Sequence, residues 1–148
     1  MKKLFLILGF ILILLVGCNK TNDTATITND IVATTNDAVT ITTDRNLYTP
    51  AMSSAQGITM SPNFKTENNY AKLEYHWITI YGEFIGVGKE VKNQGEAVIW
   101  SAIENDKVID IKDSFDINLE VIDSESQKIL ANTKLTIIPN NGFYEIKK

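Results

Sequence analysis

The chain is poor in the residues from which catalytic and metal sites are most often built. Its 148 residues include one cysteine, Cys18, and one histidine, His76. A single thiol cannot form an intramolecular disulfide or a multi-cysteine metal site, so packing alone must hold the fold together. A single histidine is a poor basis for a zinc site, and it would have to be the base for any serine nucleophile. We therefore expect a chain without metal, cofactor or catalytic activity.

The sequence also lacks an apolar run long enough for a membrane-spanning helix, which needs about 20 residues. The run at residues 4–16 is shorter, follows two lysines and ends in Gly17-Cys18. A basic start, a short apolar middle and a small residue before cysteine are the layout of a bacterial lipoprotein signal peptide. We predict that residues 1–17 are cleaved and that Cys18 is acylated, which anchors the chain at the extracytoplasmic face of the cell membrane. A plain secretory signal and an uncleaved anchor are the alternatives.

Positive charge is in short supply. The formal net charge is −4, and loss of residues 1–17 would remove two more lysines. An acidic envelope protein repels nucleic acid and anionic lipid headgroups, so neither is expected as a ligand. The expected partners are the membrane, through the lipid, and an envelope protein or glycan.

Residues 18–43 contain a seven-residue repeat of low complexity. Thr-Asn-Asp recurs at residues 21–23, 28–30 and 35–37. These residue types are poor helix formers and no second apolar seam accompanies them, which argues against a coiled coil. We expect a disordered tether with an end-to-end distance of about 25–30 Å. The alternative is that the last copy, Ala38–Thr43, is the first strand of the following domain.

Residues 44–148 read as a β domain in which turn residues separate short alternating runs. Alternation of apolar and polar residues is clearest at residues 71–77, 115–121 and 131–137. Shorter candidate strands lie at residues 57–60, 83–87, 97–101, 108–111 and 143–146. Asn141-Gly142 predicts a tight hairpin, because both residues tolerate positive φ. About seven or eight short strands and no convincing helical period indicate an all-β fold, an antiparallel sandwich.

The order of aromatic residues in this domain resembles that of an immunoglobulin-like sandwich. An aromatic-x-Trp strand, Tyr75-His76-Trp77, is followed by Gly82 and by Trp100-Ser101, and a later strand ends in Val121-Ile122-Asp123 before a turn. With a final Leu-x-Ile strand, the pattern looks like that of polycystic-kidney-disease-type (PKD) modules. The resemblance covers residues 44–138 and implies an immunoglobulin-like fold.

A second segment, Tyr48-Thr49-Pro50-Ala51-Met52-Ser53-Ser54 with Gly57-Ile58, resembles accessory extracellular domains of β-lactam-sensor-like membrane metallopeptidases. The penicillin-binding chemistry of those sensors needs a serine with a lysine three residues later, and no serine of this chain has one. The resemblance therefore implies an accessory envelope domain and no catalysis.

Four residues are candidates for contact with a ligand or partner: Tyr48, Met52, His76 and Trp100. Tyr48 and Met52 flank a proline-containing loop, where they would form an exposed apolar patch or pack over the edge of the sandwich. Trp100 lies in a run that is apolar on both faces, so its orientation is ambiguous, and an exposed ring there would stack on a sugar. His76 alternates outward on its strand, whereas Trp77 is expected in the core.

These features predict a lipid-anchored cell-envelope module that binds or interacts without catalysis. An accessory sensor or inhibitor subunit beside a membrane enzyme is one alternative, and a glycan-binding adhesin is another. A continuous exposed aromatic strip would favour the glycan, and a long unpaired edge strand would favour a protein.

Overall fold

A computed structural model describes residues 36–51 and 56–147. Two predicted sites, Cys18 and Met52, lie outside the described residues, as do the repeat copies before residue 36. The described part is all-β, with antiparallel pairing and no helix, and therefore with no helix that is long and apolar enough to cross a membrane. The strands are β1 (Ala38–Thr43), β2 (Leu47–Tyr48), β3 (Ile58–Lys65), β4 (Leu73–Ile78), β5 (Glu83–Phe84), β6 (Glu90–Asn93), β7 (Val98–Ser101), β8 (Ile103–Glu104), β9 (Lys107–Val108), β10 (Phe115–Asp123), β11 (Lys128–Asn140) and β12 (Phe143–Lys147).

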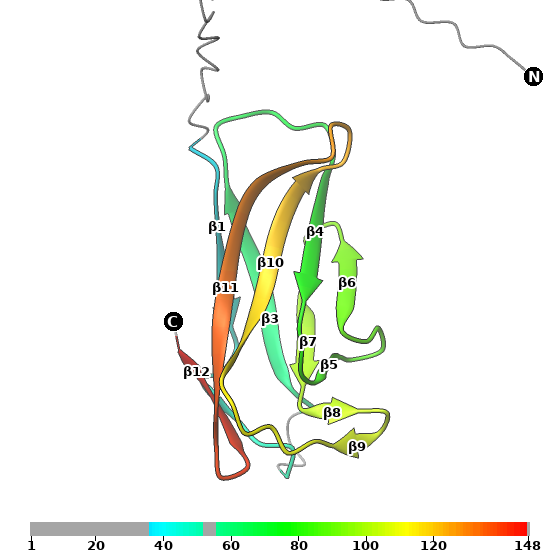
Figure 1. The fold of residues 1–148 in the computed structure, drawn as a ribbon. Coiled ribbons are helices and arrows are strands. Elements are labelled where there is room, and N and C mark those ends of the chain that lie inside the picture. Colours follow the sequence, from blue (N-terminus) through cyan, green and yellow to red (C-terminus); the bar gives the residue numbers. More distant parts are fainter. Residues whose placement is uncertain (1–35, 52–55, 148) are drawn as a thin grey trace, which may run out of the picture. The chain divides into compact units, whose positions relative to one another are not determined.

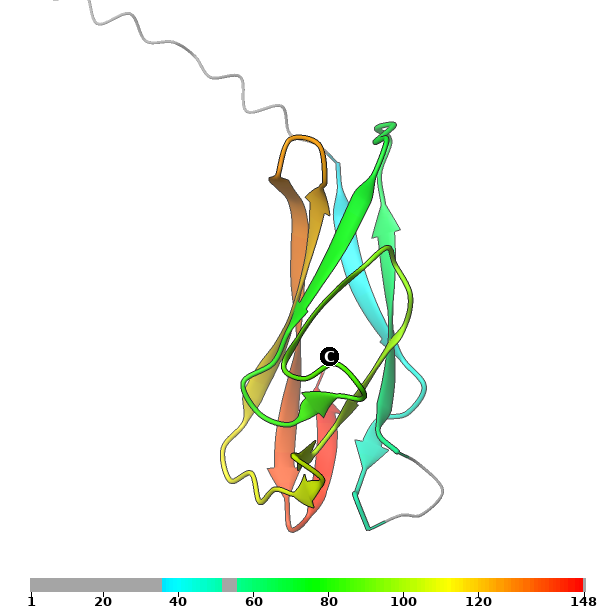
Figure 2. The ribbon, with the colours of Figure 1, turned by 90° about the vertical axis from the view of Figure 1, so that its right-hand side faces the viewer.

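The strands form two main sheets and a small hairpin. One sheet has the order β1-β3-β7-β5, the other has the order β2-β12-β11-β10-β4-β6, and β8 pairs with β9 alone. Figure 2 shows the two main sheets as two layers, with the longest strands of each running side by side. One cluster of buried residues takes side chains from both sheets, so the layers share a single core.

The three alternating runs of the sequence contain β4, β10 and β11, and the structure confirms their inward faces except at Ala71, which is exposed and lies before β4. Phe115, Ile117, Leu119 and Val121 are all buried on β10. Leu119 pairs with the fully buried Trp77 of β4 on one side and with Thr133 of β11 on the other. The inward side chains of β10 therefore have at least one apolar or aromatic partner across the sheet, as expected for alternation on a half-buried sheet.

The β unit begins earlier than residue 44. Ala38–Thr43, the last repeat copy, is the edge strand β1 and pairs along its whole length with β3. Val39 is buried, and Ile41 packs against the core. Of the two alternatives for this repeat copy, the structure shows the strand. Val39 and Ile41, two β-branched residues that point inward, are enough to hold this edge strand against the core because β3 pairs with it along its whole length.

Two expected strands are shorter than the sequence suggested. The run at residues 83–87 is strand only at Glu83–Phe84, since Gly86 and Gly88 adopt positive φ and turn the chain. The run at residues 108–111 is strand only at Val108, in the β8–β9 hairpin. The Asn141-Gly142 hairpin is confirmed, with φ of 49° and 81°.

Different connections lie at the two ends of the β unit. Ala38 pairs with Lys65, so the chain joins the β unit at the end that holds the β3–β4 connection and the β10–β11 hairpin (Figure 1). The β4–β5 and β5–β6 connections and the β8–β9 hairpin lie at the opposite end. We call residues 79–89 and 103–108 the distal loops, because they lie far from Ala38.

Candidate functional site

The distal loops carry most of the exposed large apolar side chains of the described residues. Five of these side chains are between 38% and 64% exposed: Ile80, Tyr81, Ile85, Val87 and Val108. The remaining three are Leu47, Ile129 and Phe143. Single exposed apolar residues are normal, whereas several on neighbouring loops make a candidate contact surface.

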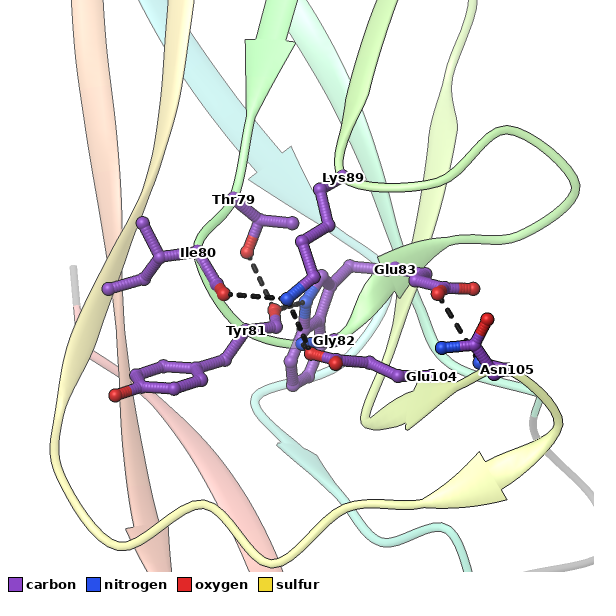
Figure 3. A network of polar contacts seen from close by, with 9 residues as sticks. Thr79, Ile80, Tyr81, Gly82, Glu83, Lys89, Glu104 and Asn105 are labelled. Carbon is purple, nitrogen blue, oxygen red and sulfur yellow. Dashed lines mark hydrogen bonds and ion pairs between the residues drawn. The ribbon is translucent and has the colours of Figure 1, made fainter.

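A charged pair holds the β4–β5 connection in place, as Figure 3 shows. Glu104 Oε1 accepts a hydrogen bond from the backbone N–H of Gly82 at 2.9 Å and lies 2.8 Å from Lys89 Nζ. Lys89 Nζ also donates to the carbonyl of Ile80 at 3.0 Å. Because one carboxylate and one ammonium group join three connections, the loop that bears Ile80 and Tyr81 is tied to both of its neighbours.

The same loop is tied to the core through the carbonyl of Tyr81. This oxygen accepts hydrogen bonds from Trp100 Nε1 at 2.8 Å and from Thr79 Oγ1 at 2.7 Å. Gly82 follows with φ of 69°, and a Cβ placed there would lie 2.2 Å from the carbonyl oxygen of Ser101 and 2.6 Å from Trp100 Nε1. Only glycine satisfies both the backbone conformation and this close approach.

The β8–β9 hairpin is equally well defined. Asn105 and Asp106 adopt φ of 50° and 62°, as a two-residue hairpin turn requires. The backbone N–H of Asn105 donates to Glu83 Oε1 at 3.3 Å, which joins this turn to β5 (Figure 3). The distal loops are thus held by hydrogen bonds to one another.

Two hollows lie among these loops. The first, with a volume of about 280 Å³, is lined by Ile85 and Gly86 of one loop, by Ile103 and Asp106 of the hairpin, and by Glu83. The second, with a volume of about 370 Å³, separates Ile80 and Tyr81 from the segment at residues 109–113. Exposed apolar walls beside charged groups give both hollows the mixed character of a binding surface.

Of the predicted contact residues, Tyr48 and Trp100 are in the core, 1% and 0% exposed. Their rings meet at 6.1 Å in an edge-to-face arrangement, and Trp100 also packs on Tyr144 and Phe115 at 5.6 Å. Buried rings cannot form the exposed patch or the sugar platform that the sequence left open, so the prediction of surface contact for these two residues is corrected. The physical reason is that both faces of β7 meet neighbouring structure, and the ring of Trp100 takes the inner one.

His76 faces outward from its sheet, as alternation predicted, but its ring is not free. Nε2 lies 2.8 Å from Glu90 Oε1 of β6, and Nδ1 lies 3.3 Å from Glu120 Oε2 of β10. Only 14% of the side chain is exposed. The ring therefore cross-links three strands on the outer face of the sheet.

Sequence reasoning missed the residues that form the exposed surface. Residues 83–87 were expected to be a short strand, whereas Ile85 and Val87 lie exposed on a turn. The signal that could have found them is the pair Gly86 and Gly88, since two glycines at this spacing favour a turn over a strand.

Among residues 36–51 and 56–147, no group of three or more histidine, cysteine, aspartate or glutamate side chains is arranged to hold a metal ion. A scan of the chain against protein-family models, a search of curated proteins and a search of solved structures found no match.

Proposed function

We propose that this chain is a lipid-anchored cell-envelope module that binds another protein through its distal loops and performs no catalysis. The observation that carries the proposal is the exposed aliphatic surface of Ile80, Ile85, Val87 and Val108, held on loops that hydrogen bonds tie to the core. A rigid apolar surface loses little conformational entropy on binding, which is what a contact surface needs.

We further propose that the fold is an immunoglobulin-like sandwich. The strand order supports this. In space, the sheet β1-β3-β7-β5 has the order A-B-E-D of such domains, and β4-β10-β11 has the order C-F-G. Strand β6 lies beside β4 as C′ would, but along the chain it follows β5, whereas C′ precedes D. Strand β12, which lies between β11 and β2, is an addition to that pattern. In that assignment the β3–β4 and β10–β11 connections correspond to the B–C and F–G loops, and the distal loops lie at the opposite end.

A protein partner fits the exposed surface better than a glycan does. Of the described aromatic residues, Tyr81 and Phe143 are the ones that are exposed, and both tryptophans are buried. Aliphatic side chains pack well against other proteins but offer no ring face for stacking on a sugar. Three of the four edge strands, β2, β5 and β6, are two, two and four residues long, which favours recognition by side chains over addition of a strand at these edges. The fourth edge strand, β1, has six residues.

The lipid anchor is proposed on the sequence around Cys18. The anchor is compatible with the arrangement of the two ends of the β unit. The first strand begins at Ala38 at one end, and the distal loops lie at the other end (Figure 1). A chain tethered at that end to a membrane would present the distal loops away from it.

Photo-crosslinking in living cells of the native host tests the proposal. A benzophenone amino acid at Val87 should crosslink to a defined envelope protein, whereas the same amino acid at Ile129 should not. Ile129 is the matched control, because it is 48% exposed, apolar and located on the β10–β11 side of the opposite end. Equal crosslinking from both positions, or none from Val87, would contradict the proposal.

A further inference from the structure

The smaller hollow of the distal loops differs from the rest of their surface in its charge. Of the three carboxylates on these loops, Glu104 is paired with Lys89. The other two, Glu83 and Asp106, both line the hollow of about 280 Å³, and neither has an ion-pair partner among the residues that the structure describes. The hollow is therefore lined by two carboxylates and by no cationic side chain of the described residues; Lys107, which follows Asp106 in the chain, is not part of its lining.

Apart from the two carboxylates, the hollow is lined by aliphatic side chains, Gly86, Ser101 and the uncharged Gln56. Ile85 and Ile103 provide aliphatic surface on two sides. Ser101, which is 2% exposed, contributes to the floor, and its Oγ lies 2.9 Å from the hydroxyl of Tyr48. Aliphatic walls, two carboxylates and the uncharged polar groups of Gln56 and Ser101 together match a ligand with an apolar stem and a positive head.

The hollow is preorganised. The positive φ of Asn105 and Asp106 fixes the turn that carries one carboxylate, and the N–H of Asn105 orients the other through Glu83 Oε1 (Figure 3). On the opposite wall, the N–H of Ile85 donates to the carbonyl of Ile99 at 2.9 Å. Groups that are already in place need not be ordered when a ligand binds.

From this charge complementarity we infer that the hollow is a receptor for one lysine or arginine side chain of the partner protein. The inference rests on the proposed function. The aliphatic stem of that side chain packs between Ile85 and Ile103, and its charged head meets Glu83 and Asp106. The volume lies below the range of drug-sized ligand sites, which begins at about 300 Å³, and a single side chain fits it. The flanking Val87 supplies apolar contact beside the cationic anchor.

A titration followed by NMR tests this assignment on the full chain in detergent micelles with isotope-labelled isoleucine methyl groups. The probe is N-acetyl-arginine methylamide, and the uncharged control is N-acetyl-norleucine methylamide. We expect the arginine probe to shift the methyl signals of Ile85 and Ile103 with a dissociation constant in the millimolar range. The norleucine probe should bind about tenfold more weakly or not at all, because it lacks the charged head.

The double variant Glu83→Gln, Asp106→Asn should lose the arginine response by about tenfold or more, since it removes both charges. Asn at position 106 tolerates the positive φ of the turn, so the hairpin is retained, and unchanged methyl spectra of the free variant verify this. The control variant Asp110→Asn removes an exposed carboxylate outside the hollow and should bind the probe as the parent does. Equal shifts from both probes, or an undiminished response in the double variant, would overturn the inference.

The two proposals fail in different ways. If Val87 crosslinks to a partner in cells but the double variant crosslinks with the same yield, the binding surface stands and the cationic anchor is wrong. If Val87 gives no crosslink while the arginine probe still binds specifically, the hollow is a receptor for cationic groups but the proposed partner surface is wrong.

Discussion

Two glycines of the distal loops provide a matched pair for testing the architecture of the candidate site. Gly82 and Gly86 both have positive φ, 69° and 81°. Their surroundings differ, because a Cβ at Gly86 would meet no atom within 4 Å, whereas a Cβ at Gly82 would lie 2.2 Å from the carbonyl oxygen of Ser101. Alanine at the two positions therefore separates the cost of the backbone conformation from the cost of the contact.

For Gly86→Ala, the left-handed conformation costs about 1–2 kcal/mol, and the stiffer unfolded chain returns about 0.4–1 kcal/mol of that. We expect a net loss of about 1 kcal/mol in the free energy of unfolding. Gly82→Ala carries the same backbone cost and also has to move the Trp100 indole from the carbonyl of Tyr81. An indole N–H left buried without a partner costs about 1–3 kcal/mol more, and the backbone clash adds to it, so the total is about 3–5 kcal/mol.

The assay is urea denaturation followed by tryptophan fluorescence, which reports on the buried Trp77 and Trp100. A domain of this size has about 5–15 kcal/mol of stability, so Gly86→Ala should remain well folded and Gly82→Ala should be marginal. Equal midpoints for the two variants would refute the reasoning, because they would mean that the approach of Gly82 to β7 adds nothing.

Four further predictions follow from the core, the charges and the anchor. Trp77→Ala should cost about 3–5 kcal/mol in chemical denaturation, whereas Trp77→Phe should cost much less, because the indole N–H has no hydrogen-bond partner among the described residues. Hydrogen bonds from Lys134 and Thr136 of β11 hold the pKa of Asp116 below its usual value. The carboxylate therefore stabilises the fold above pH ~4, and this stabilisation is lost in more acidic solution. Asp116→Asn should lessen the fall in melting temperature below pH ~4. Burial raises the pKa of Tyr144, so stability should decline above pH ~10 and Tyr144→Phe should lessen that decline in the same melts. Cys18→Ala should leave the β unit folded but abolish labelling with radioactive palmitate and release the protein from membranes, and a variant that still sediments with membranes would contradict the lipid anchor.

The central strands can be predicted from the sequence because they are long and have one face exposed to solvent. On β10, four inward residues alternate with polar ones, and a single-residue slip would expose all of them, so the pattern leaves one register. Asn141-Gly142 is similarly informative, since the hairpin backbone itself demands those residue types.

The edge strands are harder to predict from the sequence, because their stability comes from the strand with which they pair. β1 has the same composition as the low-complexity repeat, which predicts a disordered tether. It forms a strand because it pairs with β3, where Val39 and Ile41 pack against the core. Trp100 was ambiguous because β7 is apolar on both faces, with Val98 and Trp100 on one face and Ile99 on the other. The exposed surface of the distal loops depends on tertiary hydrogen bonds such as Gly82 to Glu104, which local patterns do not encode.

The central claim, that the distal loops contact a protein in the envelope, is tested most directly by thiol accessibility. Cys18 is the only cysteine, and acylation would consume it, so Val87→Cys would carry the only free thiol. We expect a membrane-impermeant maleimide to label Val87→Cys several-fold more slowly in intact cells than in the purified protein, while Ile129→Cys reacts at similar rates in both. A Val87→Cys thiol that reacts in cells as fast as in the purified protein would contradict the claim.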